Sequence, residues 1–141
     1  MKSAKLMVAL MITVVPMLAS AQLKNSDKIV VRVPFQFIVA NKPVPAGQWS
    51  VQVATADDRT VMIRNGDAKL NRFANIYESE ASQAATAPSL VFHKYGDRYF
   101  LSGMKIEGTR TMYRLPESKA EMELRAQNAP MSEQILLAYL Q

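Results

Sequence analysis

The chain has 141 residues, with 17 Lys or Arg and 12 Asp or Glu, which gives a net charge of +5. It contains no cysteine, which excludes disulfides and thiolate metal sites. Its single histidine excludes a metal site built from two histidines. Without disulfides, the folded chain must rely on its hydrophobic core.

The first 21 residues have the pattern of a cleavable signal peptide. Lys2 and Lys5 form a basic start, Leu6–Leu18 is an uncharged apolar run, and a small-residue cleavage site ends at Ala21. As a helix, the apolar run spans about 20 Å, less than the roughly 30 Å of a bilayer core. We therefore expect cleavage after Ala21, a periplasmic or extracellular mature protein, and no membrane span in it.

After a flexible leader at residues 22–28, we expect one β-domain over residues 29–141. Alternating apolar residues predict a long half-buried strand over Ile29–Val39, at an edge or bulged at Pro34. Val44–Gly47 has the residues of a turn. The partner strand is expected at Gln48–Ala54, with three side chains facing inward: Trp49, Val51 and Val53.

The middle of the chain predicts a second hairpin and a loop. Thr60–Arg64 is expected to be a short strand, and Asn65-Gly66 is a strong signal for a two-residue hairpin turn. The return strand is expected at Asn71–Tyr77. The segment Glu78–Ser89 is rich in Ala and Ser and predicts a long exposed loop.

The stretch 90–104 predicts a central hairpin, with Leu90–Tyr95 and Arg98–Met104 joined by Gly96-Asp97 in a type II′ turn. The expected opposed pairs are Tyr95 with Arg98, Lys94 with Tyr99, His93 with Phe100, and Phe92 with Leu101. Alternation puts one set of side chains on one face: Leu90, Phe92, Tyr99 and Leu101. The other face receives Val91, His93, Phe100, Ser102 and Met104. Since neither face is polar throughout, we expect both to be covered.

The last third predicts a strand at Thr111–Leu115 and a helix over residues 118–127. Ser118 and Glu121 form a capping box at the start of this helix. A closing strand is expected over residues 133–140, with Ile135, Leu137 and Tyr139 on one face, and a second helix stays open there as the alternative. The fold class is mainly β, a single small antiparallel β-sandwich or partly open barrel of about eight strands, with the helix laid on a sheet.

Three segments together resemble a family of short, signal-bearing exported proteins of unknown function from soil-dwelling Gram-negative bacteria. They are VPFQFIVANKPVPAGQWSVQV (Val33–Val53), LVFHKYGDRYFLS (Leu90–Ser102) and RLPESKAEMEL (Arg114–Leu124). The family pattern is VPFxFxV, PAGxY, LVFHRYGDxYFL and LPxSxAExEL. This chain departs from it in having Lys94 in place of Arg and Trp49 in place of Tyr. The resemblance implies export and a shared fold, and no activity.

The chemistry-bearing residues favour a non-enzymatic protein. His93 is the only histidine, so a catalytic triad would have to use it. Ser102 lies two residues beyond Phe100, the expected partner of His93, and Asp97 lies on the turn. This spacing predicts no Ser–His–acid contact, and we expect His93 to bond to backbone or to a neighbouring hydroxyl. No glycine pattern for phosphate and no spaced acidic series is present, so we expect no cofactor and no metal site.

The first functional hypothesis is an exported domain that binds a small apolar molecule or an envelope component. Its candidate ligand-binding residues are His93, Tyr95, Arg98, Phe100 and Trp49. The alternative is a structural or interaction protein that docks on another envelope protein through an edge strand or a basic face. That basic face would comprise Lys94, Arg98, Lys105, Arg110 and Arg114. Export argues against a nucleic-acid partner.

Overall fold

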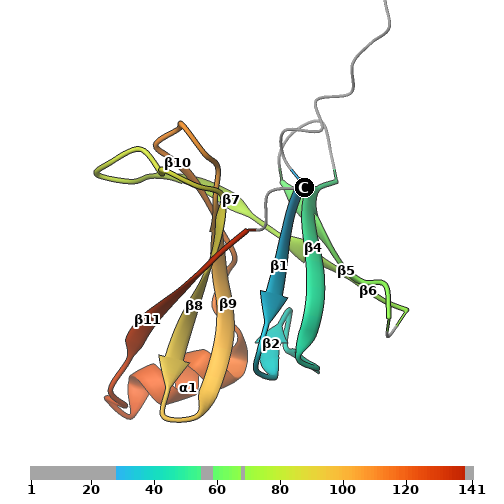
Figure 1. Ribbon diagram of the computed structural model, residues 1–141. Coiled ribbons are helices and arrows are strands. Elements are labelled where there is room, and N and C mark those ends of the chain that lie inside the picture. The colour runs from blue at the N-terminus through green and yellow to red at the C-terminus, as the bar shows by residue number, and fades with distance from the viewer. Residues whose placement is uncertain (1–27, 55–58, 68, 139–141) are drawn as a thin grey trace, which may run out of the picture.

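A computed structural model describes residues 28–54, 59–67 and 69–138, which form two β-sheets and one helix (Figure 1). The sheets face each other and are not joined into a closed barrel, so the predicted mainly β class and small β-sandwich are confirmed. The predicted signal peptide and residues 22–27 of the leader lie outside the described residues. The described helix is too short to cross a membrane.

Sheet A has four antiparallel strands in the order β1-β4-β5-β6. Its strands are β1 (Lys28–Val33), β4 (Gly47–Val53), β5 (Thr60–Asn65) and β6 (Leu70–Asn75). The predicted pairing of β1 with β4 is confirmed, with Val31 opposite Trp49. Trp49 and Val51 are buried in the core, as their alternation with polar neighbours predicts.

Sheet B is built around the predicted central hairpin, in the order β11-β8-β9-β10-β7. Its strands are β7 (Tyr77–Glu80), β8 (Ser89–Tyr95), β9 (Arg98–Lys105), β10 (Thr111–Arg114) and β11 (Ser132–Leu137). A small hairpin of β2 (Phe37–Val39) and β3 (Lys42–Val44) joins this sheet through a parallel pairing of Ile38 with Phe100. The inner faces of both sheets share one hydrophobic core.

The prediction of one long strand over Ile29–Val39 is wrong. The strand ends before Pro34, and its two parts, β1 and β2, belong to different sheets. Proline has no N–H to donate to a ladder, so the chain leaves sheet A there and crosses to sheet B. The chain then reverses at Ala40 and Asn41, which have φ of 49° and 63°, as in a two-residue hairpin of type I′.

Three further predictions in the middle of the chain are wrong. Asn65 lies in β5 and pairs with Leu70, so this hairpin is not closed by the expected two-residue turn at Asn65-Gly66. The expected return strand Asn71–Tyr77 is split between β6 and β7. The first residues of the expected loop Glu78–Ser89 lie in β7 and pair with β10, where backbone pairing outweighs the weak strand propensity of the sequence.

The central hairpin has the predicted register, with Tyr95 opposite Arg98 and His93 opposite Phe100, and Gly96 has a φ of +61°. Beyond Phe92 the register shifts, because Val91 pairs with Gly103 and leaves Ser102 as an extra residue in β9. After the bulge, the side chains of β9 alternate between the two faces of the sheet in the opposite order. Met104 therefore packs in the core, which corrects its predicted place on the face of His93.

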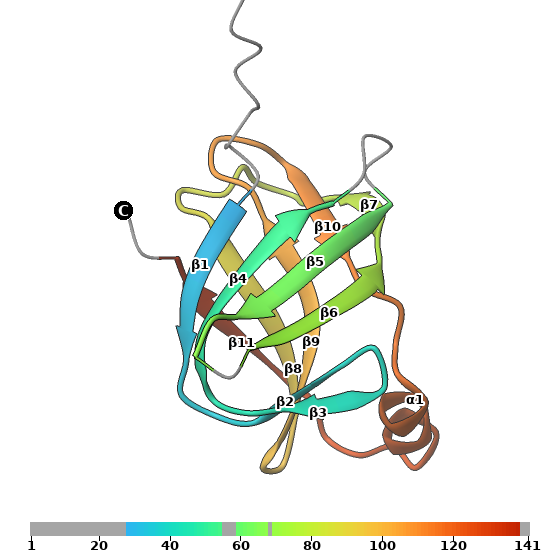
Figure 2. The ribbon, with the colours of Figure 1, turned by 90° about the vertical axis from the view of Figure 1, so that its right-hand side faces the viewer.

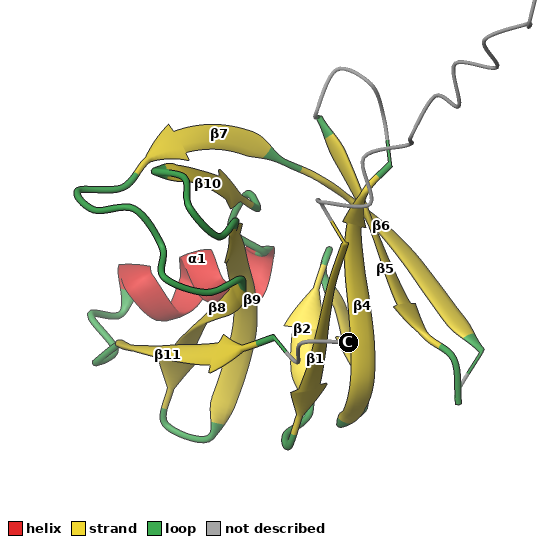
Figure 3. Ribbon diagram, turned by 45° about the horizontal axis from the view of Figure 1, so that its top comes forward, coloured by secondary structure: helices red, strands yellow, loops and turns green. Residues whose placement is uncertain are grey.

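The helix α1 (Lys119–Ala126) lies within the predicted bounds and has Ser118 as its N-cap. Figure 3 shows it beside β8 and β9, with the strands of sheet A on their other side. The closing segment is a strand, β11, as predicted. Ile135 and Leu137 are exposed, however, and Leu136 packs against the core. Tyr139 lies outside the described residues.

Candidate functional site

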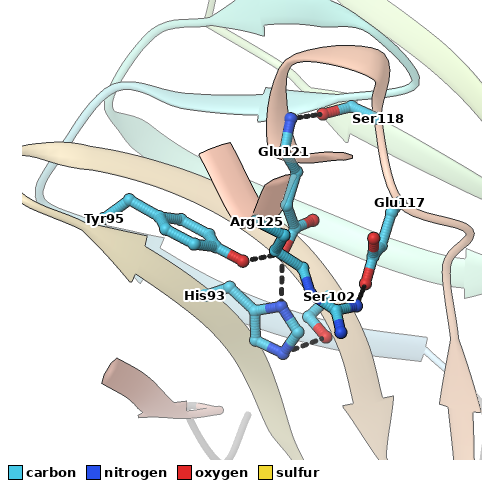
Figure 4. A network of polar contacts seen from close by, with 7 residues as sticks. All are labelled: His93, Tyr95, Ser102, Glu117, Ser118, Glu121 and Arg125. Carbon is cyan, nitrogen blue, oxygen red and sulfur yellow. Dashed lines mark hydrogen bonds and ion pairs between the residues drawn. The ribbon is translucent and has the colours of Figure 1, made fainter. Parts of the chain in front are cut away.

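Four polar side chains meet between α1 and the outer face of the central hairpin (Figure 4). Ser102 Oγ lies 3.0 Å from His93 Nε2, and His93 Nδ1 lies 2.5 Å from Glu121 Oε1. The Tyr95 hydroxyl donates to the same carboxylate oxygen over 3.0 Å. We call these four residues, Ser102, His93, Glu121 and Tyr95, the polar network.

The bulge in β9 and the helix cap place the members of this network. As the extra residue, Ser102 faces outward with His93, although the two are not directly opposed. At the helix start, Ser118 Oγ accepts a hydrogen bond from the Glu121 N–H over 3.1 Å. This is half of the predicted capping box, because the Glu121 carboxylate turns to His93 and Tyr95.

The prediction that strand spacing keeps Ser, His and acid apart is therefore wrong. Ser102 does contact His93, and the acid is Glu121 from the helix, while Asp97 lies on the turn. The predicted bond of His93 to a neighbouring hydroxyl is present. The sequence held one signal for this contact, which is an acid, Glu121, in the first turn of a helix expected to lie on a sheet.

The Tyr95 hydroxyl donates to Glu121 Oε1. In the tautomer of neutral His93 that carries its proton on Nδ1, this nitrogen donates to the same carboxylate oxygen and Nε2 accepts from the Ser102 hydroxyl. Burial, followed by the hydrogen bond from Tyr95 to Glu121 and the charge of that carboxylate, raises the pKa of Tyr95 from 10.0 to about 12.

The order Ser102–His93–Glu121 resembles a hydrolytic triad, but its surroundings differ from those of one. A nucleophilic serine must meet its substrate, and Ser102 is only 6% exposed. The Glu121 carboxylate also accepts a hydrogen bond from Tyr95, and a catalytic triad needs no such second donor to its acid. The arrangement favours a structural role, in which a buried carboxylate attaches α1 to the sheet through two hydrogen bonds.

A groove of about 710 Å³ lies beside this network. Its walls are α1, the β2–β3 hairpin and the turn of the central hairpin, which lie together at one end of the sandwich in Figure 2. The apolar part of its lining consists of Phe37, Ile38, Pro43, Tyr99 and Ala120. The volume is within the roughly 300–1,000 Å³ of small-molecule sites.

Helix α1 connects the groove to the polar network. Lys119, Ala120 and Glu123 line the groove, while Glu121 faces the hairpin. The start of the helix is also held by Asn41, whose Oδ1 accepts a hydrogen bond from the Lys119 N–H over 2.8 Å. The position of this groove wall therefore depends on contacts of the helix with both hairpins.

The structure distributes the five predicted ligand-binding residues over three places. Arg98 lines the groove, and its guanidinium lies 5.4 Å from the centre of the Phe100 ring. His93 and Tyr95 belong to the polar network, and Phe100 is buried against Tyr95. Trp49 is apart from these four, buried in the core and donating from Nε1 to the carbonyl of Pro45.

Four of the five residues of the predicted basic face have individual partners, and that of Arg98 is the Phe100 ring. Arg110 pairs with Glu80 over 3.2 Å, and Arg114 Nε donates to Ser79 Oγ over 2.8 Å. The Lys94 ammonium lies 5.4 Å from the centre of the Tyr99 ring. Each of these charged side chains is therefore held by a neighbouring residue of sheet B.

The groove residues on α1 and on β2 are the part that sequence reasoning missed. Ile38 falls in the predicted long half-buried strand, and Ala120 falls in the helix that is expected to lie on a sheet. No protein-family model, curated protein or solved structure matches the chain.

Proposed function

We propose that the protein is an exported, non-enzymatic β-domain that binds a small molecule with an apolar part in the groove beside α1. The observation that carries this proposal is the 710 Å³ groove with Ile38, Tyr99 and Ala120 in its lining. Five of its eleven lining residues are apolar and six are polar or charged, and concave sites that combine apolar walls with polar groups are where small ligands bind. The N-terminal signal pattern supports a location in the cell envelope or outside the cell.

The packed interior supports a site in the groove over one inside the sandwich. The facing sheets are filled by large side chains that are less than 2% exposed, including Trp49, Phe37 and Phe92. Phe37 contacts both other rings edge-on, with centroids 5.4 and 5.3 Å apart. A ligand between the sheets would have to displace this core.

Docking on another envelope protein through an edge strand is the second candidate. Its support is β11, a terminal strand of sheet B with Ile135 43% exposed and Leu137 64% exposed. The groove supports the first candidate more strongly, because it combines a concave shape with apolar and charged groups.

Native mass spectrometry of protein purified from the cells that make it tests the proposal. We expect a small molecule to co-purify with the wild type and to be lost from Ala120→Trp, in which an indole fills the groove. Met122→Trp is the matched control, since Met122 is on the same helix and 49% exposed but does not line the groove. A bare protein, or a ligand kept equally by both variants, would contradict the proposal, and a bound protein lost on substituting Leu137→Ser would favour docking.

A further inference from the structure

Four charged side chains surround the groove, two from each of two walls. Asp97 and Arg98 come from the turn of the central hairpin, and Lys119 and Glu123 come from α1. None of the four forms a salt bridge with another described residue. Each wall thus offers one positive and one negative charge to the groove, and the four charges sum to zero.

Helix stability does not account for this arrangement on α1. Lys119 is the first residue of the helix, where the macrodipole disfavours a cation. Lys119 and Glu123 are four residues apart with the cation first, which is the weaker orientation for a pair within a helix. Arg125, by contrast, lies in the last turn of the helix, where the macrodipole favours a cation, and it forms a salt bridge with Glu117.

The charges also limit what the groove can accept. A ligand that carries charge of only one sign would be attracted by two of these side chains and repelled by the other two. A ligand carrying both signs can place its anion near Arg98 and Lys119 and its cation near Asp97 and Glu123. The apolar part of the lining then remains for a hydrocarbon portion.

We propose that the groove binds a monomeric zwitterionic amphiphile, a molecule with an apolar chain and a head group that holds an ammonium and a phosphate or carboxylate. This inference rests on the proposed function, because it names the ligand class of the same groove. The guanidinium of Arg98, placed over the Phe100 ring, is a suitable partner for the anionic group.

Isothermal titration with four probes that share a decyl chain tests the ligand class, with each probe below its micelle concentration. The probes are decylphosphocholine, decyl sulfate, decyltrimethylammonium and decyl maltoside. We expect decylphosphocholine to bind about tenfold more tightly than any of the others. If all four probes bind the wild type equally and all bind Ala120→Trp more weakly, the groove is the ligand site but the preference for a zwitterion is overturned. If no probe binds, or if Ala120→Trp binds the probes as the wild type does, the proposed function is overturned as well.

Charge-removing variants test the assignment of the four side chains. The double variant Arg98→Gln, Lys119→Gln should weaken decylphosphocholine binding about tenfold, the scale of a lost charge-assisted hydrogen bond. Arg32→Gln, an exposed cation on β1 outside the groove, is the matched control and should bind as the wild type does. Equal affinity of the double variant and the control would overturn the inference, as would binding to phosphatidylcholine vesicles without binding of the monomeric probe.

Discussion

Replacing Glu121 by Ala should destabilise the protein by about 3 kcal/mol. The Glu121 side chain is 4% exposed, and its carboxylate accepts hydrogen bonds from both His93 and Tyr95. Its removal leaves two donors without their acceptor, and each buried unsatisfied group costs about 1–3 kcal/mol. The His93 side chain is 16% exposed and can turn to water, so most of the loss comes from the buried hydroxyl of Tyr95.

Urea unfolding followed by the fluorescence of Trp49, the only tryptophan, measures this loss. With an m-value of about 2 kcal/mol per M, the midpoint should fall by about 1.5 M. Glu123→Ala is the matched control, because Glu123 is an exposed acid on the same helix and should change stability by no more than about 0.5 kcal/mol. If the two variants unfold within about 0.5 kcal/mol of each other, the network does not attach the helix.

Three further predictions follow from single contacts. The pKa of Tyr95 is about 12 in the folded chain and near 10 when unfolded, so the unfolded state loses its proton first and stability should fall as the pH rises from 10 to 12, by up to about 3 kcal/mol. Urea midpoints measured across this range should fall less steeply in Tyr95→Phe. Gly103→Ala should lower the melting temperature by several degrees, since its Cβ would lie 2.8 Å from the backbone oxygen of Tyr113, which cannot turn away as a side chain can; calorimetry in which this variant melts with the wild type would contradict the packing. Asn41→Gly keeps the positive φ but removes the acceptor of the Lys119 N–H, so hydrogen exchange of that amide should quicken while amides of β4 stay unchanged.

The parts of the fold that local pattern determines could be predicted from the sequence. The Gly96-Asp97 turn and the alternation on both sides of it define the register near the turn of the central hairpin. The cap residue Ser118 defines the start of the helix. Each is a property of neighbouring residues, so no knowledge of the rest of the chain was needed.

The missed features depend on contacts between distant segments. The bulge has no glycine or other local mark at its extra residue, Ser102, and it decides whether Met104 faces the core or the helix. The Glu121 carboxylate has two available roles, capping its own helix or bonding to His93, and only tertiary packing chooses between them. The groove likewise combines segments that are about 80 residues apart in sequence, which no single-segment pattern can indicate.

The central claim is that the groove beside α1 is the ligand site. A titration with decyl maltoside followed by backbone amide chemical shifts tests it directly, because this uncharged probe reports on the apolar lining independently of head-group charge. We expect saturable shifts of the amides of Ile38, Tyr99 and Ala120 in the wild type and no such shifts in Ala120→Trp. Shifts centred on Leu137 of the exposed edge strand, or none that saturate, would contradict it.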